Sequence, residues 1–213
     1  ANYNLGIVLE DKGLLLAAEA CLRQAIALRP DFAEAYTNLG NVLSGLGRLD
    51  DAETCLRQAI ALQPSLVAEA NYNLGIVLEG QGRLLAAEAC LRQAIAHRPH
   101  YAQAYSNLSG VLLKQSRVEA AEACLRQALC MDMGLASIYS NLLFCLAHRA
   151  DLSPAELFAE HLRFGEQFEA PLRAGWQPHP NDRHPDRPIR VGLVSGDLRN
   201  HAIAHFLEPL ISP

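Results

Sequence analysis

The side chains best suited to chemistry lie near the C-terminus, after a short β-rich run from Ile189 to Val194. This run is predicted to be a strand, a loop follows it, and His201 to Ile211 is predicted to be a helix. A loop between a parallel strand and a helix N-terminus is where α/β sheets bind ligands, and an imidazole there titrates near neutral pH. His201 is therefore a candidate proton-transfer group, although it could equally cap or pack the start of the helix.

Neither a metal site nor a disulfide framework is predicted. His201 and His205 have the i, i+4 spacing of two ligands on one helix face, but Ala202 stands where a zinc protease needs Glu, and no third ligand is evident. Four of the six cysteines recur at the same place in successive repeats, too far apart for disulfides. We expect them to be small, buried, reduced thiols in a reducing compartment: Cys21, Cys55, Cys90 and Cys124.

Composition excludes several classes of partner. Of 213 residues, 50% are hydrophobic and 19% are charged, which is typical of a folded protein rather than a disordered one. The net charge of −5 argues against nucleic acid and anionic membranes as partners. No apolar run reaches the roughly 18–20 residues of a transmembrane helix, and we predict a cytoplasmic protein. Because Ala1 is not Met and the chain begins inside a repeat, its natural start is expected to precede this sequence.

A unit of about 34 residues recurs four times and sets the architecture that must position these groups. Each copy opens with Asn-Leu-Gly or Asn-Leu-Ser and later carries Cys-Leu-Arg-Gln-Ala. This pattern resembles the tetratricopeptide repeat, a helix–turn–helix unit that buries its apolar face against its neighbours. Residues 1–147 are predicted to form a right-handed superhelix of four repeats and a partial fifth, with a concave binding face.

The second repeat, Ala33 to Pro64, shows why the helices form. Its first helix carries an apolar stripe at helical spacing: Tyr36, Leu39, Gly40 and Leu43. Gly47 marks the turn, and Pro64 ends the second helix because proline cannot continue it. Small residues such as Gly40 are expected to let the two helix backbones approach closely.

Asparagine occupies the same place in all five first helices: Asn4, Asn38, Asn73, Asn107 and Asn141. One interpretation is structural, with each amide satisfying local hydrogen bonds. The other is a ladder of amides along the inner groove, which would bind the backbone of an extended acceptor peptide because carboxamides both donate and accept. The repeats alone leave both interpretations open, and the residues that follow them favour the ladder.

Three segments follow the repeats. Residues 148–174 are predicted to form a transitional helix, because Ser153-Pro154-Ala155-Glu156 is a capping box with proline at the first helical position. Residues 175–188 are rich in proline and are predicted to be a linker. Residues 189–213 supply one strand and one helix, whereas a parallel sheet needs neighbouring strands. We therefore expect the chain to be one piece of a longer enzyme.

The run from Arg190 to His205 resembles the start of the catalytic region of bacterial O-linked N-acetylglucosamine transferases. It carries an Arg-Val-Gly strand, then Ser-x-Asp-x-x-Asn-His and a second His four residues later. The resemblance implies that His201 is the catalytic base. It also places three neighbours in the active site: Asp197, Asn200 and His205.

The resemblance further implies a fold and substrates. The fold would be mostly α, a tetratricopeptide superhelix followed by the first βα unit of a Rossmann-like, α/β catalytic lobe of the GT-B type. The donor would be UDP-N-acetylglucosamine (UDP-GlcNAc), the acceptor Ser or Thr of proteins bound by the five asparagines, and no metal would be needed. The rest of the catalytic domain would be a necessary partner, so the chain alone is expected to be inactive. The alternatives are a related O-fucosyltransferase and a non-catalytic scaffold for protein–protein interaction.

Overall fold

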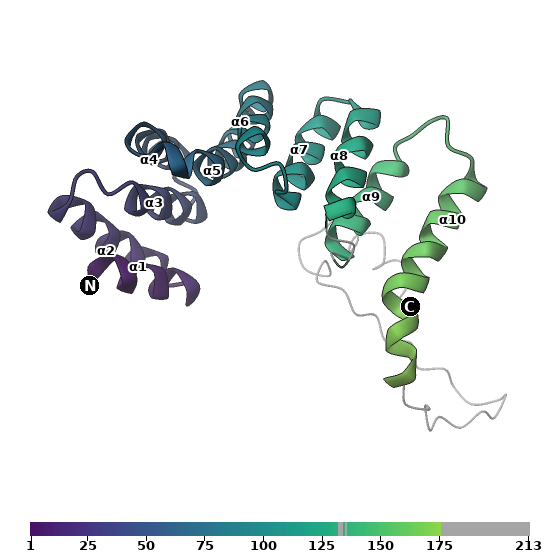
Figure 1. Cartoon of the computed structure of the whole chain (residues 1–213), viewed down its shortest axis with the longest axis horizontal. Helices are drawn as coiled ribbons and strands as arrows, with labels where there is room; N and C mark the ends of the chain where they lie inside the picture. The colour runs from purple at the N-terminus through teal and green to yellow at the C-terminus, as the bar shows by residue number, and fades with distance from the viewer. Residues whose placement is uncertain (132–133, 135, 176–213) are drawn as a thin grey trace, which may run out of the picture. The chain divides into compact units, whose positions relative to one another are not determined.

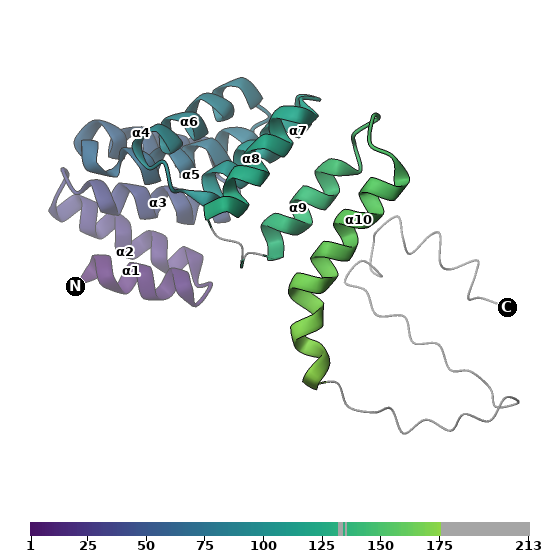
Figure 2. The same ribbon diagram turned by 45° about the vertical axis from the view of Figure 1, so that its right-hand side comes forward.

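A computed structural model of the protein describes residues 1–131, 134 and 136–175. The chain divides into two compact units, Ala1–Ala174 and Gly175–Pro213, and the described residues other than Gly175 belong to the first. Within that unit, ten α-helices follow one another in pairs, as Figures 1 and 2 show. The predicted helix pairs are therefore confirmed.

The helices of each pair lie on either side of a short turn, and each pair packs on the next. The pairs are α1 (Asn2–Asp11) with α2 (Leu15–Leu28), α3 (Ala33–Gly45) with α4 (Leu49–Leu62), α5 (Val67–Gly80) with α6 (Leu84–His97), α7 (Ala102–Lys114) with α8 (Val118–Met131), and α9 (Ala136–Leu146) with α10 (Pro154–Phe164). The first helices also contact one another, α1 with α3 and so on to α9. They therefore share one face, which we call the inner face.

Tight turns join the two helices of a pair. Gly13, Gly47 and Gly82 have φ angles of 72°, 76° and 74°, a left-handed conformation that glycine adopts readily because it lacks a Cβ atom. The prediction that Gly47 marks a turn is confirmed. In the fourth repeat Ser116 occupies the same place with a φ of 60°, so this turn carries backbone strain.

The core lies between the helices of each pair, and in the first three pairs a glycine there meets a leucine. The leucine of the Cys-Leu-Arg-Gln-Ala run is fully buried in all four repeats: Leu22, Leu56, Leu91 and Leu125. A Cβ atom added to Gly40 would lie 2.6 Å from Cγ of Leu56, which is closer than such atoms can approach. Gly40 therefore lets the two backbones pack closely, as predicted, and its neighbours Ala52 and Ala59 are fully buried.

Ion pairs tie each repeat to the next in a regular series, which we call the ion-pair ladder. In each repeat a glutamate of the second helix pairs with an arginine in the turn of the following repeat: Glu19 with Arg48 at 2.8 Å, Glu53 with Arg83 at 2.6 Å, Glu88 with Arg117 at 2.7 Å, and Glu122 with Arg149 at 2.6 Å. An arginine four residues after each glutamate pairs with it too. Burial raises the pKa of each carboxyl, but its hydrogen bonds and the two guanidinium charges outweigh burial and hold the pKa below its usual value.

The capping box predicted at residues 153–156 is confirmed. The Ser153 hydroxyl accepts from the backbone N–H of Glu156 at 3.3 Å, and the backbone N–H of Ser153 donates to the Glu156 carboxylate at 2.9 Å. A π-helical turn, Gly165–Glu169, and a 3-10 helix, Ala170–Gly175, continue α10. The rings of Phe164 and Phe168 pack edge-on against Tyr139 of α9, with centroids 5.5 and 5.9 Å away.

The four repeated cysteines are half-buried rather than buried, which corrects the prediction. Their thiols are free, and burial raises the pKa of three of them: Cys55, Cys90 and Cys124. Cys145 is the fully buried thiol, and burial raises its pKa to about 11. Raised pKa values make thiols poor nucleophiles.

The predicted fold class is wrong in its second part. Residues 1–131, 134 and 136–175 form helices and no strand, so the fold of the described residues is an all-helical repeat superhelix without a βα unit of an α/β lobe. A parallel strand needs neighbouring strands, and these helices supply none. The residues expected to form the linker and the βα unit, 176–213, lie outside the described residues. None of the described helices is long and apolar enough to cross a membrane.

Candidate functional site

Among the predicted site residues, the five asparagines lie in the part of the chain that the structure describes. His201 lies outside it, as do its three predicted neighbours: Asp197, Asn200 and His205. The candidate site is therefore the inner face of the repeats.

Each asparagine occupies the same position on a first helix, from α1 to α9. Asn4 and Asn141 are exposed, and the other three are half-buried. Since the first helices contact one another in order, the five amides form a series along the inner face. Whether these amides bind a peptide stays a prediction.

Three of these amides bind the preceding repeat. Nδ2 of Asn38 donates to the Tyr3 hydroxyl at 3.2 Å, and Nδ2 of Asn141 donates to the Ser106 hydroxyl at 3.2 Å. Asn107 makes the corresponding hydrogen bond to Tyr72. Within the described residues the amides of Asn4 and Asn73 have no hydrogen-bond partner. The asparagines thus serve repeat packing at three positions and present a free amide at two.

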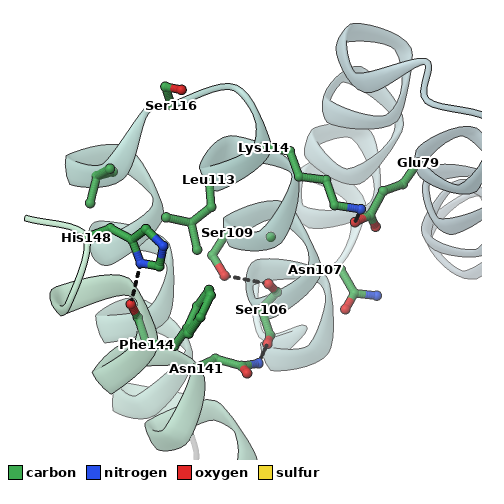
Figure 3. Close-up of a pocket in the computed structure, with 12 residues that line it drawn as sticks. Glu79, Ser106, Asn107, Ser109, Leu113, Lys114, Ser116, Asn141, Phe144 and His148 are labelled. Carbon is green, nitrogen blue, oxygen red and sulfur yellow. Dashed lines mark hydrogen bonds and ion pairs between the residues drawn. The ribbon is translucent and has the colours of Figure 1, made fainter. Parts of the chain in front are cut away.

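A pocket of about 750 Å³ opens on the inner face between α5, α7 and α9. Leu113, Val118 and Phe144 give it an apolar lining, and Asn107 and Asn141 lie at its wall. Figure 3 shows Leu113 from α7 and Phe144 from α9 reaching into the same hollow, beside the ion pair of Lys114 with Glu79 at 2.9 Å. Phe144 is 62% exposed, and its ring lies 4.5 Å from that of His148, centroid to centroid.

Gly110 creates this hollow. The corresponding first-helix positions in the earlier repeats hold Ile7, Asn41 and Ile76, and Phe144 follows in the fifth. A Cβ atom added to Gly110 would meet only an Oε1 atom of Glu79, at 3.9 Å, so the space beside it is open. Sequence analysis missed Gly110 and Phe144, although a glycine at a position that is isoleucine in two other repeats was a readable signal.

The charges of three glutamates act on the Tyr3 hydroxyl, farther along the same face. Burial raises the pKa of Tyr3, the hydrogen bond with Asn38 lowers it in part, and the charges of Glu34, Glu69 and Glu10 raise it further. None of these three glutamates has an ion-pair partner within residues 1–131 and 136–175. We call the part of the inner face that carries these three unpaired carboxylates the acidic region; the Arg29 guanidinium lies beside it, 3.4 Å from the Phe32 ring.

Comparison with known proteins identifies the repeats. The tetratricopeptide repeat family matches three overlapping stretches, residues 1–65, 31–99 and 66–133. A search of curated proteins found no significant match.

Several solved structures have the same fold at low sequence identity. MamA from Desulfovibrio magneticus is 20% identical, covers 79% of this chain and 94% of its own, and superposes with a TM-score of 0.70. PilF from Pseudomonas aeruginosa is 21% identical, with coverage of 83% and 76% and a TM-score of 0.69. The TPR protein YrrB is 20% identical, with coverage of 82% and 90% and a TM-score of 0.61. At this identity the likeness shows the fold alone.

These comparisons overturn the prediction of an enzyme. The family match is to a helical repeat, and neither that match nor the structures above point to a glycosyltransferase, a GT-B lobe or a UDP-GlcNAc site. A sixteen-residue resemblance was too short to establish such a domain. Since the family match spans more than half of the sequence, the chain belongs to the tetratricopeptide repeat family.

Proposed function

We propose that the protein is a non-catalytic interaction scaffold that binds an extended segment of a partner protein along its inner face. The observation that carries this proposal is the series of five asparagines on contacting first helices. An extended backbone alternates donors and acceptors, and a carboxamide can pair with either. Such binding recognises the chain itself rather than its sequence.

The hydrogen bonds within the repeats are compatible with this role. Asn38 and Asn141 each use Nδ2 to bind the preceding repeat, and no partner for their carbonyl oxygens is present among the described residues. Those carbonyl oxygens can accept from peptide N–H groups, while the free amides of Asn4 and Asn73 can both donate and accept. YrrB, a structure of the same fold, is described as a TPR protein with an unusual peptide-binding site.

The test removes the two amides that serve no packing role. The double variant Asn4→Ala with Asn73→Ala is expected to bind an array of synthetic peptides of varied sequence about tenfold more weakly, with its melting temperature unchanged. The matched control removes two carboxamides from second helices in the same repeats: Gln24→Ala with Gln93→Ala, both exposed. Equal binding by the two double variants would remove the asparagines from recognition.

A further inference from the structure

The pocket beside Gly110 differs from the rest of the inner face in chemistry. Its volume of about 750 Å³ falls within the range of about 300–1,000 Å³ that is typical of ligand pockets. Its floor is apolar, and Phe144 is 62% exposed, with the His148 ring 4.5 Å from its own, centroid to centroid. The two groups placed to bind a backbone, Asn107 and Asn141, lie at its wall. An amide ladder alone does not require such a hollow.

Charge on the neighbouring part of the face indicates what else the occupant carries. In the ion-pair ladder each glutamate pairs with two arginines, and Glu79 at the pocket pairs with Lys114. Glu10, Glu34 and Glu69, in contrast, have no ion-pair partner in the described residues. Lysine or arginine side chains of a ligand would form ion pairs with these three carboxylates.

The acidic region and the pocket are continuous. Asn107 at the pocket wall binds Tyr72, whose ring lies 4.8 Å from that of Tyr101, centroid to centroid. Burial raises the pKa of Tyr101 to about 12, the Arg98 guanidinium 4.7 Å from its ring lowers it in part, and the charge of Glu69 raises it. One extended segment can therefore reach both regions.

We propose that the pocket binds a bulky apolar side chain of an extended segment whose flanking residues are lysine or arginine. This inference rests on the proposed function and adds a sequence preference to it. The apolar residue fills the space left by Gly110, against Leu113 and Phe144. The basic residues meet the unpaired carboxylates.

The test uses a fluorescein-labelled peptide of lysine and glycine with one central tryptophan, and fluorescence anisotropy as readout. Two control peptides replace the tryptophan by alanine or the lysines by glutamate. We expect the tryptophan peptide to bind about tenfold more tightly than either control, because it buries an aromatic ring and pairs its charges. Raising the salt concentration is expected to weaken the charge contribution and to leave the tryptophan preference.

Two variants address the pocket itself. Gly110→Ile introduces the residue that the first and third repeats carry; its Cβ atom meets no backbone within 4 Å, so we expect the variant to fold and its side chain to occupy the hollow. Phe144→Ala removes the exposed ring. Both are expected to abolish the preference for tryptophan over alanine, whereas Leu85→Ala, at a 79% exposed residue of α6 outside the pocket, is expected to keep it.

The outcomes separate this inference from the proposed function. If Gly110→Ile kept the tryptophan preference while the Asn4 and Asn73 double variant still lost peptide binding, the pocket inference would fall and the scaffold proposal would stand. If no peptide bound to the natural protein, on the array or in solution, both would fall. Loss of the preference in Gly110→Ile with an unchanged circular dichroism spectrum supports the pocket.

Discussion

At the scale of single residues, Ser116 adopts a backbone conformation that the other repeats give to glycine. Its φ of 60° places a Cβ atom close to the following carbonyl oxygen, which costs about 1–2 kcal/mol. We expect Ser116→Gly to raise the free energy of unfolding by about 1 kcal/mol. The expected gain is at the lower end of that range because glycine also increases the conformational entropy of the unfolded chain. Urea denaturation followed by circular dichroism measures the change.

The reverse substitution serves as its control. A Cβ atom at Gly47 would meet no atom within 4 Å, so Gly47→Ser changes the backbone preference without adding a clash. A loss of about 1 kcal/mol is expected. A Ser116→Gly protein no more stable than the natural one would show that this turn carries no strain.

At the scale of helices, the ion-pair ladder joins elements that hydrophobic packing alone would leave free to slide. The Glu88 side chain is 6% exposed and pairs with Arg92 at 2.5 Å and Arg117 at 2.7 Å. In the folded protein the pKa of Glu88 is below its usual value, whereas the pKa of a glutamate in the unfolded chain is about 4.3. The stability it contributes is therefore present above that pH and is lost as the pH falls through the folded pKa.

Glu88→Gln is accordingly expected to lower the free energy of unfolding by about 1 kcal/mol at neutral pH. The difference between variant and natural protein is expected to shrink as the pH falls below about 4.3 and to vanish below the folded pKa of Glu88, where both proteins lack the charge. Thermal melts over a pH series measure this. Asp31→Asn, at an exposed carboxylate, is the control. A difference that stayed constant with pH would contradict an ionic contribution.

The ion-pair ladder also shows which features of the helices could not be predicted from the sequence. Apolar residues at helical spacing predicted where the helices lie, and the Ser153 capping box predicted where α10 begins. Both predictions succeeded because they depend on residues that are close in the chain. Glu19 and Arg48 are separated by 29 residues, so their pairing depends on how one repeat packs on the next. The regular recurrence of both residue types was the available signal. For the same reason, the half-burial of the repeated cysteines was not predicted.

At the scale of the whole molecule, the repeats form two larger modules. Residues 70–79 repeat residues 1–10 without a difference. In the first module Tyr3 stacks on Phe32 at 4.6 Å with the Arg29 guanidinium 3.4 Å from the Phe32 ring, and the second module repeats this arrangement with its own aromatic pair and arginine. Between the modules Thr37 stands where Tyr3 and Tyr72 stand, so no such stack forms there. Repeats are thus joined alternately with and without aromatic stacking.

The same scale explains which functional predictions failed. A repeated pattern can be checked within the sequence itself, because every copy has the same residues at the same spacing. The superhelix could therefore be predicted. The enzyme prediction depended on a single short run around His201 that no second segment supported. The pocket could not be predicted, because Gly110 of α7 and Phe144 of α9 lie in different repeats. They line one pocket only when these two helices pack together. The asparagines were found because they recur.

A matched pair of substitutions tests whether the repeats unfold as a linear series, in which each unit depends on its neighbours. A Cβ atom at Gly75 would lie 2.7 Å from Cγ of Leu91, and one at Gly6 would lie 2.8 Å from Cγ of Leu22, so the local clash is the same. The surroundings differ, because Leu5 and Val8 of α1 are 50% and 47% exposed, whereas Leu74 and Val77 of α5 are buried.

We expect Gly75→Ala to lower the free energy of unfolding of the whole array by about 1–3 kcal/mol. Gly6→Ala is expected to increase hydrogen exchange in α1 and α2 while leaving the slowest amides of α5 to α8 unchanged, because α1 buries less of its apolar surface than α5 and can open locally. Native-state hydrogen exchange resolves the two cases. Faster exchange of the slowest amides in both variants would mean that the array unfolds as one cooperative unit, and that nearest-neighbour coupling does not describe this protein.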